Sequence, residues 1–205
     1  MKQAIKSVAS RPAIAAYRAL PCRPLLHVVR KANNIQLTTA ELSEIIASVR
    51  RRPRCRFLVF GLGNDSHFWA AVNRGGRTLF LEDHLDWIRQ VTSRHPHLET
   101  LKVQYTTRIT QWKELLERPE QLTMELPPEV RESEWDVVLV DAPAGWNDMA
   151  PGRMQSIFMS RSLAAPGGDV FVHDCDREVE QTYSDRFLPE KGLLSTVGKL
   201  RHYRV

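Results

Sequence analysis

The chain has 205 residues, of which 42% are hydrophobic and 26% charged, with a formal net charge of +5. This composition is ordinary for one soluble globular domain with a sizeable core. Three scattered cysteines exclude a disulfide framework, and no apolar run of about 18 residues is present to span a bilayer.

The positive charge is unevenly spread along the chain. Residues 1–56 hold 12 of the Lys and Arg residues but only 2 of the Asp and Glu residues. A basic segment can face a polyanion, a membrane or nucleic acid. Because no aromatic interleaving, RNA-binding signature or zinc-ligand spacing accompanies it, we expect no nucleic-acid partner. An acidic polysaccharide or a plain solvated surface fits the segment better.

Two parts of the chain are expected: a basic N-terminal arm at 1–36 and a domain at 37–205. The arm is interrupted by Pro12, Pro21 and Pro24, so it is expected to be irregular or helical in pieces. Its composition suits a transit peptide and also an amphipathic helix packed over the domain. The sequence leaves both possibilities open.

Beyond residue 36, predicted strands alternate with predicted helices. Thr38 lies three residues before Glu41, a capping-box spacing that predicts a helix running to Arg52, before Pro53. Prolines and glycines predict an excursion at 118–134 and a turn at 166–168. The expected strands are 57–60, 78–83, 101–105, 135–140, 170–172, 193–197 and 200–205, and the later helices are 68–72, 85–91, 111–117, 151–164 and 177–187.

This alternation predicts an α/β fold with a doubly wound, mostly parallel sheet of seven strands and helices on both faces. Ligands of such sheets bind outside the carboxyl ends of the strands. Every expected carboxyl end is polar here. The residues concerned are Gly61, Gly63 and Asp65, then Glu82, then Asp141, and finally His173 with Asp174.

The first strand ends in a glycine turn that opens a helix. Gly61 and Gly63 let a ligand approach the main chain, and Glu82 lies 21 positions after Gly61, where a carboxylate can accept bonds from ribose hydroxyls. Alternatively, Glu82 and Asp83 cap the following helix. A nicotinamide-binding fold is the competing interpretation. The third glycine of the dinucleotide fingerprint is missing, which argues against a pyrophosphate site and favours S-adenosylmethionine, because that cofactor has no phosphates.

Asp141 and Asp174 each follow a hydrophobic strand directly. If the two strands are neighbours, the carboxylates meet at one rim, and a divalent cation would relieve their repulsion, with Asp176 or His173 as third ligand. Such a cation would lower the pKa of a sugar hydroxyl, and His173 is the alternative general base. The competing interpretation makes Asp141 a turn cap and Asp174 or Asp176 a helix cap.

These residues resemble the plant polysaccharide-biosynthesis family that includes glucuronoxylan 4-O-methyltransferases. The similarity runs from about residue 37 to the end. Its segments are 55–66 with Trp69, 76–82, 135–143, 150–154, 170–174 and 177–180. The resemblance implies a class I S-adenosylmethionine methyltransferase fold of the Rossmann-like type. It also implies transfer of a methyl group to O-4 of glucuronic acid in a glycan such as glucuronoxylan, with a divalent cation.

By position, the resemblance assigns cofactor binding to a set of residues around the glycine turn. They are Gly61, Gly63, Asp65, Ser66, Glu82 and Asp141. Asp141 and Asp174 are similar to the metal aspartates of catechol-type O-methyltransferases, although Cys175 replaces the Asn that follows the second Asp there. Arg153 is the candidate for gripping the uronate carboxylate bidentately, and Trp146 is a second candidate acceptor contact.

The sequence departs from the family in three respects. Asn64 stands where the plant enzymes have His, His67 and Phe68 also differ, and the expected membrane anchor is absent. The compartment is therefore cytoplasmic if the chain is complete and Golgi if it is a truncated plant-type member, and the oligomeric state is open. A small-molecule, catechol-like O-methyltransferase and a non-catalytic accessory protein of polysaccharide synthesis are the alternative functions.

Overall fold

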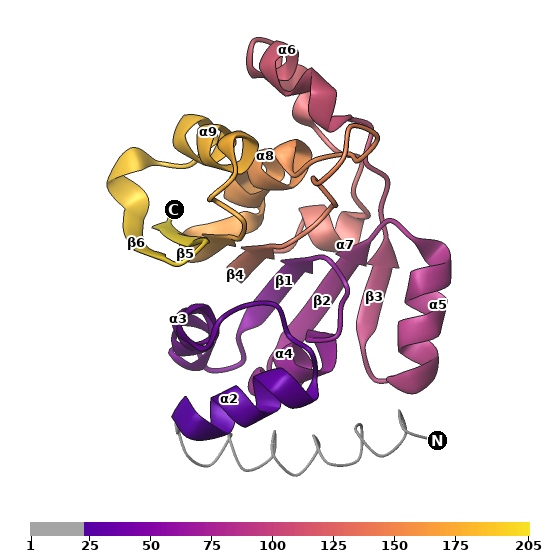
Figure 1. Cartoon of the computed structure of the whole chain (residues 1–205), viewed down its shortest axis with the longest axis vertical. Helices are drawn as coiled ribbons and strands as arrows, with labels where there is room; N and C mark the ends of the chain where they lie inside the picture. The colour runs from indigo at the N-terminus through magenta and orange to yellow at the C-terminus, as the bar shows by residue number, and fades with distance from the viewer. Residues whose placement is uncertain (1–22) are drawn as a thin grey trace.

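The computed structural model describes residues 23–205, which form one seven-stranded sheet with helices on both faces (Figure 1). The strand order is β3-β2-β1-β4-β5-β7-β6. The strands are β1 (Arg56–Phe60), β2 (Arg77–Glu82), β3 (Glu99–Lys102), β4 (Trp135–Val140), β5 (Ala164–Val172), β6 (Leu193–Val197) and β7 (Leu200–Arg204). Strands β1 to β5 are parallel, whereas β7 runs antiparallel to both β5 and β6.

Helices of different length connect the strands. The longer ones are α2 (Arg23–Ala32), α3 (Thr39–Arg50), α4 (Ser66–Val72), α5 (Leu85–Arg94), α8 (Met154–Leu163) and α9 (Glu178–Phe187). The shorter ones are η1 (Ile109–Gln111), α6 (Trp112–Leu116), η2 (Pro119–Leu122), α7 (Pro128–Arg131) and η3 (Glu190–Gly192). None of the helices from residue 23 onward combines the length and the apolar character needed to cross a membrane.

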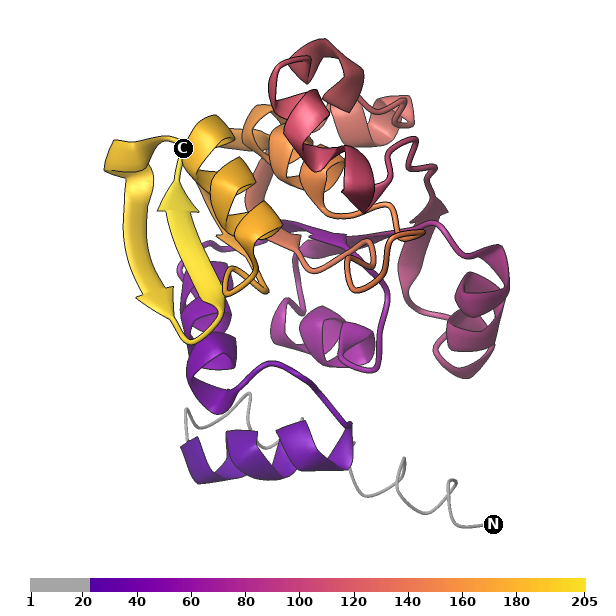
Figure 2. The ribbon, with the colours of Figure 1, turned by 45° about the horizontal axis from the view of Figure 1, so that its top comes forward.

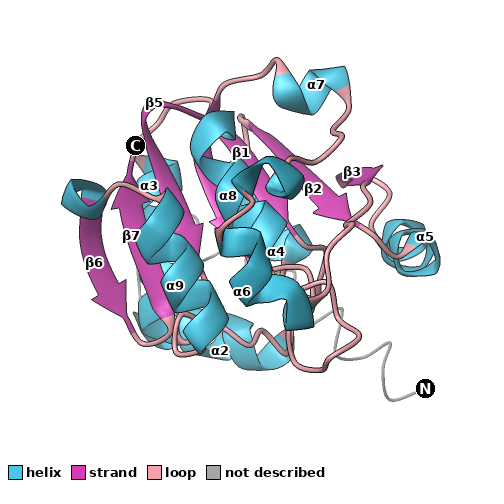
Figure 3. Ribbon diagram, turned by 90° about the horizontal axis from the view of Figure 1, so that it is seen from above, coloured by secondary structure: helices cyan, strands magenta, loops and turns pink. Residues whose placement is uncertain are grey.

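The sheet separates two hydrophobic clusters, because successive side chains of a strand point to opposite faces. In β1, Leu58 and Phe60 pack with α6, α8 and α9, while Phe57 and Val59 pack with α2, α3 and α4. Figures 2 and 3 show these two helical layers on either side of the strands. This double burial explains the continuous apolar runs of β1 and β4 and confirms the doubly wound fold expected from the sequence.

The crevice for a ligand follows from the strand order. Strand β1 pairs with β2 on one side and with β4 on the other, so the connections leave β1 in opposite directions. At such a switch point the loops after the strands separate and leave a crevice at their carboxyl ends. The glycine turn after Phe60 lies at this point.

The described part of the basic arm packs against the domain. Leu26 and Val29 of α2 are fully buried in the cluster that also contains α3. Thr38 caps α3 as predicted: its side chain accepts the amide hydrogen of Glu41, and Glu41 accepts that of Thr38. The rest of the expected arm, residues 1–22, lies outside the described residues.

Several boundaries differ from the sequence prediction. Strand β3 covers 99–102 rather than 101–105, and helix α8 begins at Met154, after the turn containing Gly152. The excursion at 118–134 includes the short helices η2 and α7, both of which have proline in the first turn. The predicted turn at 166–168 belongs to β5, in which Gly167 has a φ of +75°. Proline and glycine were correct signs of irregular backbone but did not locate it to the residue.

A buried carboxylate in β5, Asp169, joins this strand to the neighbouring strand β7 and to the end of α3. Asp169 of β5 is fully buried and accepts hydrogen bonds from Arg52, from Arg204 Nε at 2.8 Å and from the His202 ring at 3.0 Å. Burial alone would raise the pKa of Asp169, but these donors outweigh it and hold that pKa well below the usual range. This cluster joins β5 and β7 to the end of α3.

We predict that Asp169→Asn lowers the free energy of unfolding by about 3–5 kcal/mol near pH 7, because Arg51, Arg52 and Arg204 lose their buried counter-charge. Urea unfolding measures this. A depressed native pKa contributes stability above the unfolded pKa of about 3.9 and loses it as the pH falls, so the deficit should shrink in acid. Asp86→Asn removes an exposed pair with Arg89 and should change little. If the two substitutions lowered the free energy of unfolding equally, the stabilising role assigned to the buried Asp169 cluster would be wrong.

Candidate functional site

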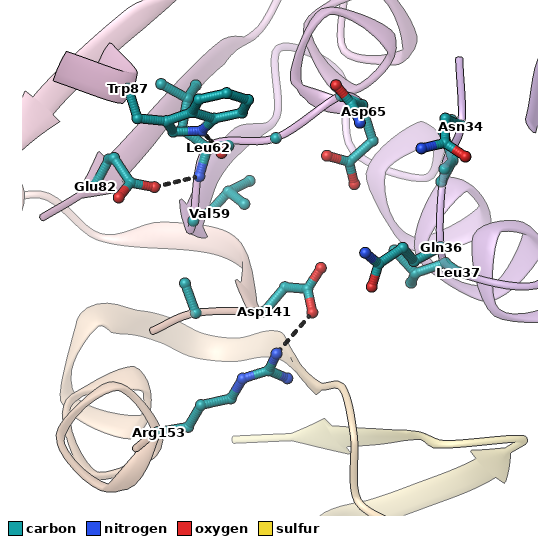
Figure 4. Close-up of a pocket in the computed structure, with 15 residues that line it drawn as sticks. Asn34, Gln36, Leu37, Val59, Leu62, Asp65, Glu82, Trp87, Asp141 and Arg153 are labelled. Atoms are coloured by element: carbon teal, nitrogen blue, oxygen red, sulfur yellow. Dashed lines mark hydrogen bonds and ion pairs between the residues drawn. The ribbon is translucent and has the colours of Figure 1, made fainter. Parts of the chain in front are cut away.

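A cavity of about 300 Å³ opens at the carboxyl ends of β1, β2 and β4 (Figure 4). Its wall combines the glycine turn, the ends of β2 and β4, and the connection between α2 and α3. The lining residues are Asn34, Ile35, Gln36, Leu37, Val59, Gly61, Leu62, Gly63, Asn64, Asp65, Glu82, Trp87, Asp141, Ala142 and Arg153. The cavity therefore lies at the switch point of the sheet, where the strand order predicts a crevice.

The glycine turn is shaped by close approach of the backbone. Gly61 has a φ of +121°, and a Cβ atom there would lie 3.0 Å from that of Ala142. The Gly61 amide donates to the Leu81 carbonyl at 2.8 Å, and the Gly63 amide donates to Ser66 Oγ at 2.9 Å. Ser66 is buried and fixes the turn without lining the cavity. Gly61 and Gly63 line it directly.

Glu82 ties the end of β2 to the glycine turn. Its Oε2 accepts the Leu62 amide at 3.2 Å, and its Oε1 accepts the amides of Asp83 and His84 at 3.0 Å each. Burial raises the pKa of Glu82. Helix α5 begins after His84 without a side-chain cap, so the predicted capping role of Asp83 is wrong. Glu82 satisfies backbone groups before the helix and also faces the cavity.

Asp65 presents a carboxylate to the same cavity from the start of α4. Its Oδ2 accepts a hydrogen bond from Trp69 Nε1 at 2.8 Å. Burial and the nearby charge of Asp141 raise the pKa of Asp65 to about 6. A positively charged ligand group would relieve this repulsion.

Arg153 joins the carboxylates that follow β4 and β5. Its Nη2 lies 3.2 Å from Asp141 Oδ1 and 2.9 Å from Asp174 Oδ2. The guanidinium also donates to the carbonyls of Pro143 and His173, and the side chain is 7% exposed. The two aspartates therefore meet at one rim as expected. Arg153 is not free for the uronate role predicted for it, because its donors are already engaged.

His173 lies behind Asp141, outside the cavity lining. Its Nδ1 is 2.9 Å from Asp141 Oδ1, and its Nε2 is 3.9 Å from Glu41. Burial opposes the charged imidazole, but the hydrogen bond and charge of Asp141 outweigh it and raise the pKa of His173. Burial would likewise raise the pKa of Asp141, yet His173 and Arg153 lower it. Asp141 is the member of this pair that reaches the cavity.

The donor atoms of Asp141, His173 and Asp174 lie within 4.8 Å of one another, which is a spacing suitable for a metal ion. However, Arg153 bridges both carboxylates, and Arg177 Nη2 lies 2.9 Å from Asp174. The two negative charges are balanced, so a dication does not fit beside these guanidinium groups. The repulsion that led us to expect a cation is relieved within the protein.

Two of the predictions around Asp174 need correction. Asp176 does not join the carboxylate cluster, because its exposed side chain pairs with Lys199 Nζ at 2.9 Å. Helix α9 begins after Arg177 without a side-chain cap, so neither Asp174 nor Asp176 caps it. Asp174 instead has a φ of +60°, a conformation uncommon outside glycine that concentrates at functional sites.

A second cavity of about 250 Å³ shares Glu82, Trp87 and Ala142 with the first. It is also lined by Asp83, His84, Pro143, Ala144 and Pro151. Trp146 lies on the same loop after β4 and is 77% exposed. The loop between β4 and α8 thus combines a cavity wall with an exposed aromatic ring.

Several side chains of the first cavity were not assigned to the site from the sequence, among them Asn34, Gln36 and Trp87. Asn34 and Gln36 fall in the stretch treated as an arm, and Trp87 falls inside a predicted helix. Trp87 Nε1 donates to the Leu62 carbonyl, which attaches α5 to the glycine turn. For Asn34 and Gln36 a signal existed, since they alternate with the apolar residues Ile35 and Leu37. Trp87 had none, because its direction depends on how α5 packs.

Comparison with known proteins gives consistent results over most of the chain. The family model described as IRX15/IRX15L/GXM matches residues 40–124 and 120–203. Glucuronoxylan 4-O-methyltransferase 2 of Arabidopsis thaliana is 40% identical over 202 residues, covering 88% of this chain and 70% of the relative. Arabinogalactan O-methyltransferase 2 of the same plant is 36% identical, covering 94% of this chain and 75% of the relative.

Among solved structures, similarity extends to a Staphylococcus aureus protein provisionally assigned as a caffeoyl-CoA O-methyltransferase. The TM-score is 0.56 at 11% sequence identity, covering 96% of this chain and 98% of that one. At this level of identity the match supports the fold alone. It agrees with the Rossmann-like sheet described above.

We predict that Arg153→Met creates a divalent-cation site by leaving Asp141 and Asp174 without their shared counter-charge. The variant should bind Mn²⁺ at least about tenfold more tightly than the unaltered chain, as measured by calorimetry. Arg161→Met, on the exposed side of the same helix, is the matched control. Equal Mn²⁺ affinity in all three proteins, or a tight site in the unaltered chain, would refute this account of Arg153.

Proposed function

This chain belongs to the IRX15/IRX15L/GXM family, and we propose that it is an S-adenosylmethionine-dependent O-methyltransferase that methylates O-4 of glucuronic acid in a glycan. One observation carries the proposal. The stretch that is 40% identical to a glucuronoxylan 4-O-methyltransferase covers 88% of the chain. The matched ranges include Gly61, Glu82 and Asp141, which line one cavity at the switch point of the sheet.

The charges around the cavity suit a cationic cofactor. S-adenosylmethionine carries positive charge on its sulfonium and ammonium groups, while Asp65, Glu82 and Asp141 supply carboxylates. Glu82 is held by three backbone amides, which leaves its oxygens oriented toward the ribose hydroxyls. Asp65 then faces the ammonium group. The turn lacks the third glycine of a pyrophosphate site, in agreement with a cofactor that has no phosphates.

Asp141 is the residue that we assign to the acceptor hydroxyl. Bound S-adenosylmethionine supplies a methyl group on a positively charged sulfur, which leaves as a neutral thioether. Asp141 orients the hydroxyl and accepts its proton as oxygen bonds to the methyl carbon. His173 and Arg153 hold Asp141 in place and ionised. These residues contribute mainly alignment and charge placement, and no step requires a cation.

Acceptor binding is assigned to the loop after β4 and to the start of α9. Trp146 offers an exposed ring against which a sugar can pack. Arg177, whose side chain is 35% exposed, lies near Gly145 and replaces Arg153 as the candidate for contacting the uronate carboxylate. Its Nη2 is fixed by Asp174 at 2.9 Å, so the guanidinium is already oriented.

We predict methyl transfer from labelled S-adenosylmethionine to glucuronoxylan or arabinogalactan, and that Asp141→Asn lowers kcat by about 100-fold or more because the proton acceptor is lost. Asp86→Asn, an exposed change on α5 outside the lining of both cavities, should leave kcat unaltered. A simple catechol serves as the comparison acceptor. Transfer to the catechol alone would overturn the glycan assignment, and the absence of transfer to all three would overturn the activity.

We also predict that affinity for S-adenosylmethionine falls as the pH drops below about 6. The pKa of Asp65 in the free protein is about 6, so Asp65 loses its charge there and no longer attracts the ammonium group. Calorimetry from about pH 5 to about pH 8 measures this change. In Asp65→Asn the affinity should be lower at about pH 8 and nearly independent of pH. A pH dependence unchanged by the substitution would assign it to another group.

A further inference from the structure

We propose that residues 34–37, here called the strap, form the subsite for the amino-acid end of the cofactor, and that the side-chain amides of Asn34 and Gln36 donate to its carboxylate. This inference rests on the proposed function, which specifies the cofactor. It assigns a binding role to a segment that the sequence placed mostly in a basic arm. The strap lies in the connection between α2 and α3, and all four of its residues line the cavity.

The strap is held in a fixed course by α2. Arg30 Nε donates to the Leu37 carbonyl at 2.6 Å, and the Ile35 amide donates to the Arg30 carbonyl at 3.0 Å. At the far end, Thr38 and Glu41 form the capping box of α3. The segment is therefore attached on both sides, which is the pre-organisation that a binding wall needs.

Alternation along the strap decides which side chains face the ligand. Ile35 and Leu37 are buried in the core at 5% and 1% exposure, whereas Asn34 and Gln36 are exposed and line the cavity. Asn34 has a φ of +52°, a left-handed conformation that Asn tolerates better than most residues. The strap thus presents two amide groups while its apolar side chains anchor it.

The position of the strap indicates which end of the cofactor it meets. Figure 4 shows Asn34 and Gln36 across the cavity from Glu82 and Trp87, with Asp65 and Asp141 on the way. With the ribose at Glu82, the amino-acid end extends toward the strap. Asp65 then lies on the path of the ammonium group, beside the amides of the strap.

The carboxylate of the cofactor also needs hydrogen-bond donors. Among the described residues that line the cavity, Arg153 is the cationic side chain, and it is engaged by Asp141 and Asp174. The amides of Leu62 and Gly63 already donate to Glu82 and Ser66. Side-chain amides therefore provide the donors that suit the carboxylate, and two of the three in the lining, Asn34 and Gln36, come from the strap.

Two ligands that differ only at the amino-acid end test the proposal. S-adenosylhomocysteine keeps the ammonium and carboxylate groups, whereas 5′-methylthioadenosine lacks both. Asn34→Gly suits the positive φ and removes one amide, and Gln36→Met keeps the length of the side chain without donors. By calorimetry, each substitution should weaken S-adenosylhomocysteine at least about tenfold and leave 5′-methylthioadenosine within about twofold.

Asn33→Ala is the matched control, because the Asn33 amide donates to the Val29 carbonyl at 2.8 Å and Asn33 is outside the cavity lining. It should change neither affinity. Equal losses for both ligands in the strap variants, or no loss for either, would overturn the subsite. An unaltered chain that binds neither ligand would instead overturn the proposed function, so the two failures are distinguishable.

Discussion

The arrangement of the site depends on one electrostatic constraint: a parallel sheet brings carboxylates from separate strands to one edge, where they must be balanced. Asp141 follows β4 and Asp174 follows β5, and these strands are neighbours. Arg153, at the start of α8, balances their repulsion by pairing with both aspartates, and Arg177 is a second positive charge paired with Asp174. The buried guanidinium also fixes the loop after β4 through the Pro143 carbonyl. Asp141 is consequently left ionised and oriented at the cavity wall.

The same constraint separates two roles within the pocket. Asp141 belongs to a balanced, tightly bonded group, which suits a residue that must hold an acceptor hydroxyl in one geometry. Asp65 and Glu82 have raised pKa values because burial is incompletely compensated, which suits residues awaiting a cationic ligand. The side of the cavity that we propose for the cofactor therefore carries unfavourable electrostatics that a cationic ligand would relieve, whereas the side that we propose for the acceptor is already balanced within the protein.

Sequence periodicity predicted the sheet and both helical layers, because strands such as β1 and β4 must be apolar on both faces to lie between helices. The capping box at Thr38 and Glu41 was equally local and was confirmed. The sequence prediction was wrong where the backbone conformation depends on contacts with segments distant in the sequence. Residues 166–168 have the composition of a turn, yet they continue β5, with Gly167 donating to the Val205 carbonyl.

The sequence by itself determined the fold class and which carboxylates stand at the strand ends, since both follow from local pattern and the geometry of parallel strands. It could not determine the partners of those carboxylates. Arg153 was expected to grip a substrate but is buried between two aspartates, and Asp176, expected to bind a metal ion, pairs with Lys199. Only the tertiary structure brought Asn34 and Gln36 to the cavity. Side-chain pairing between distant segments is decided by how helices pack on the sheet, and no local pattern records that.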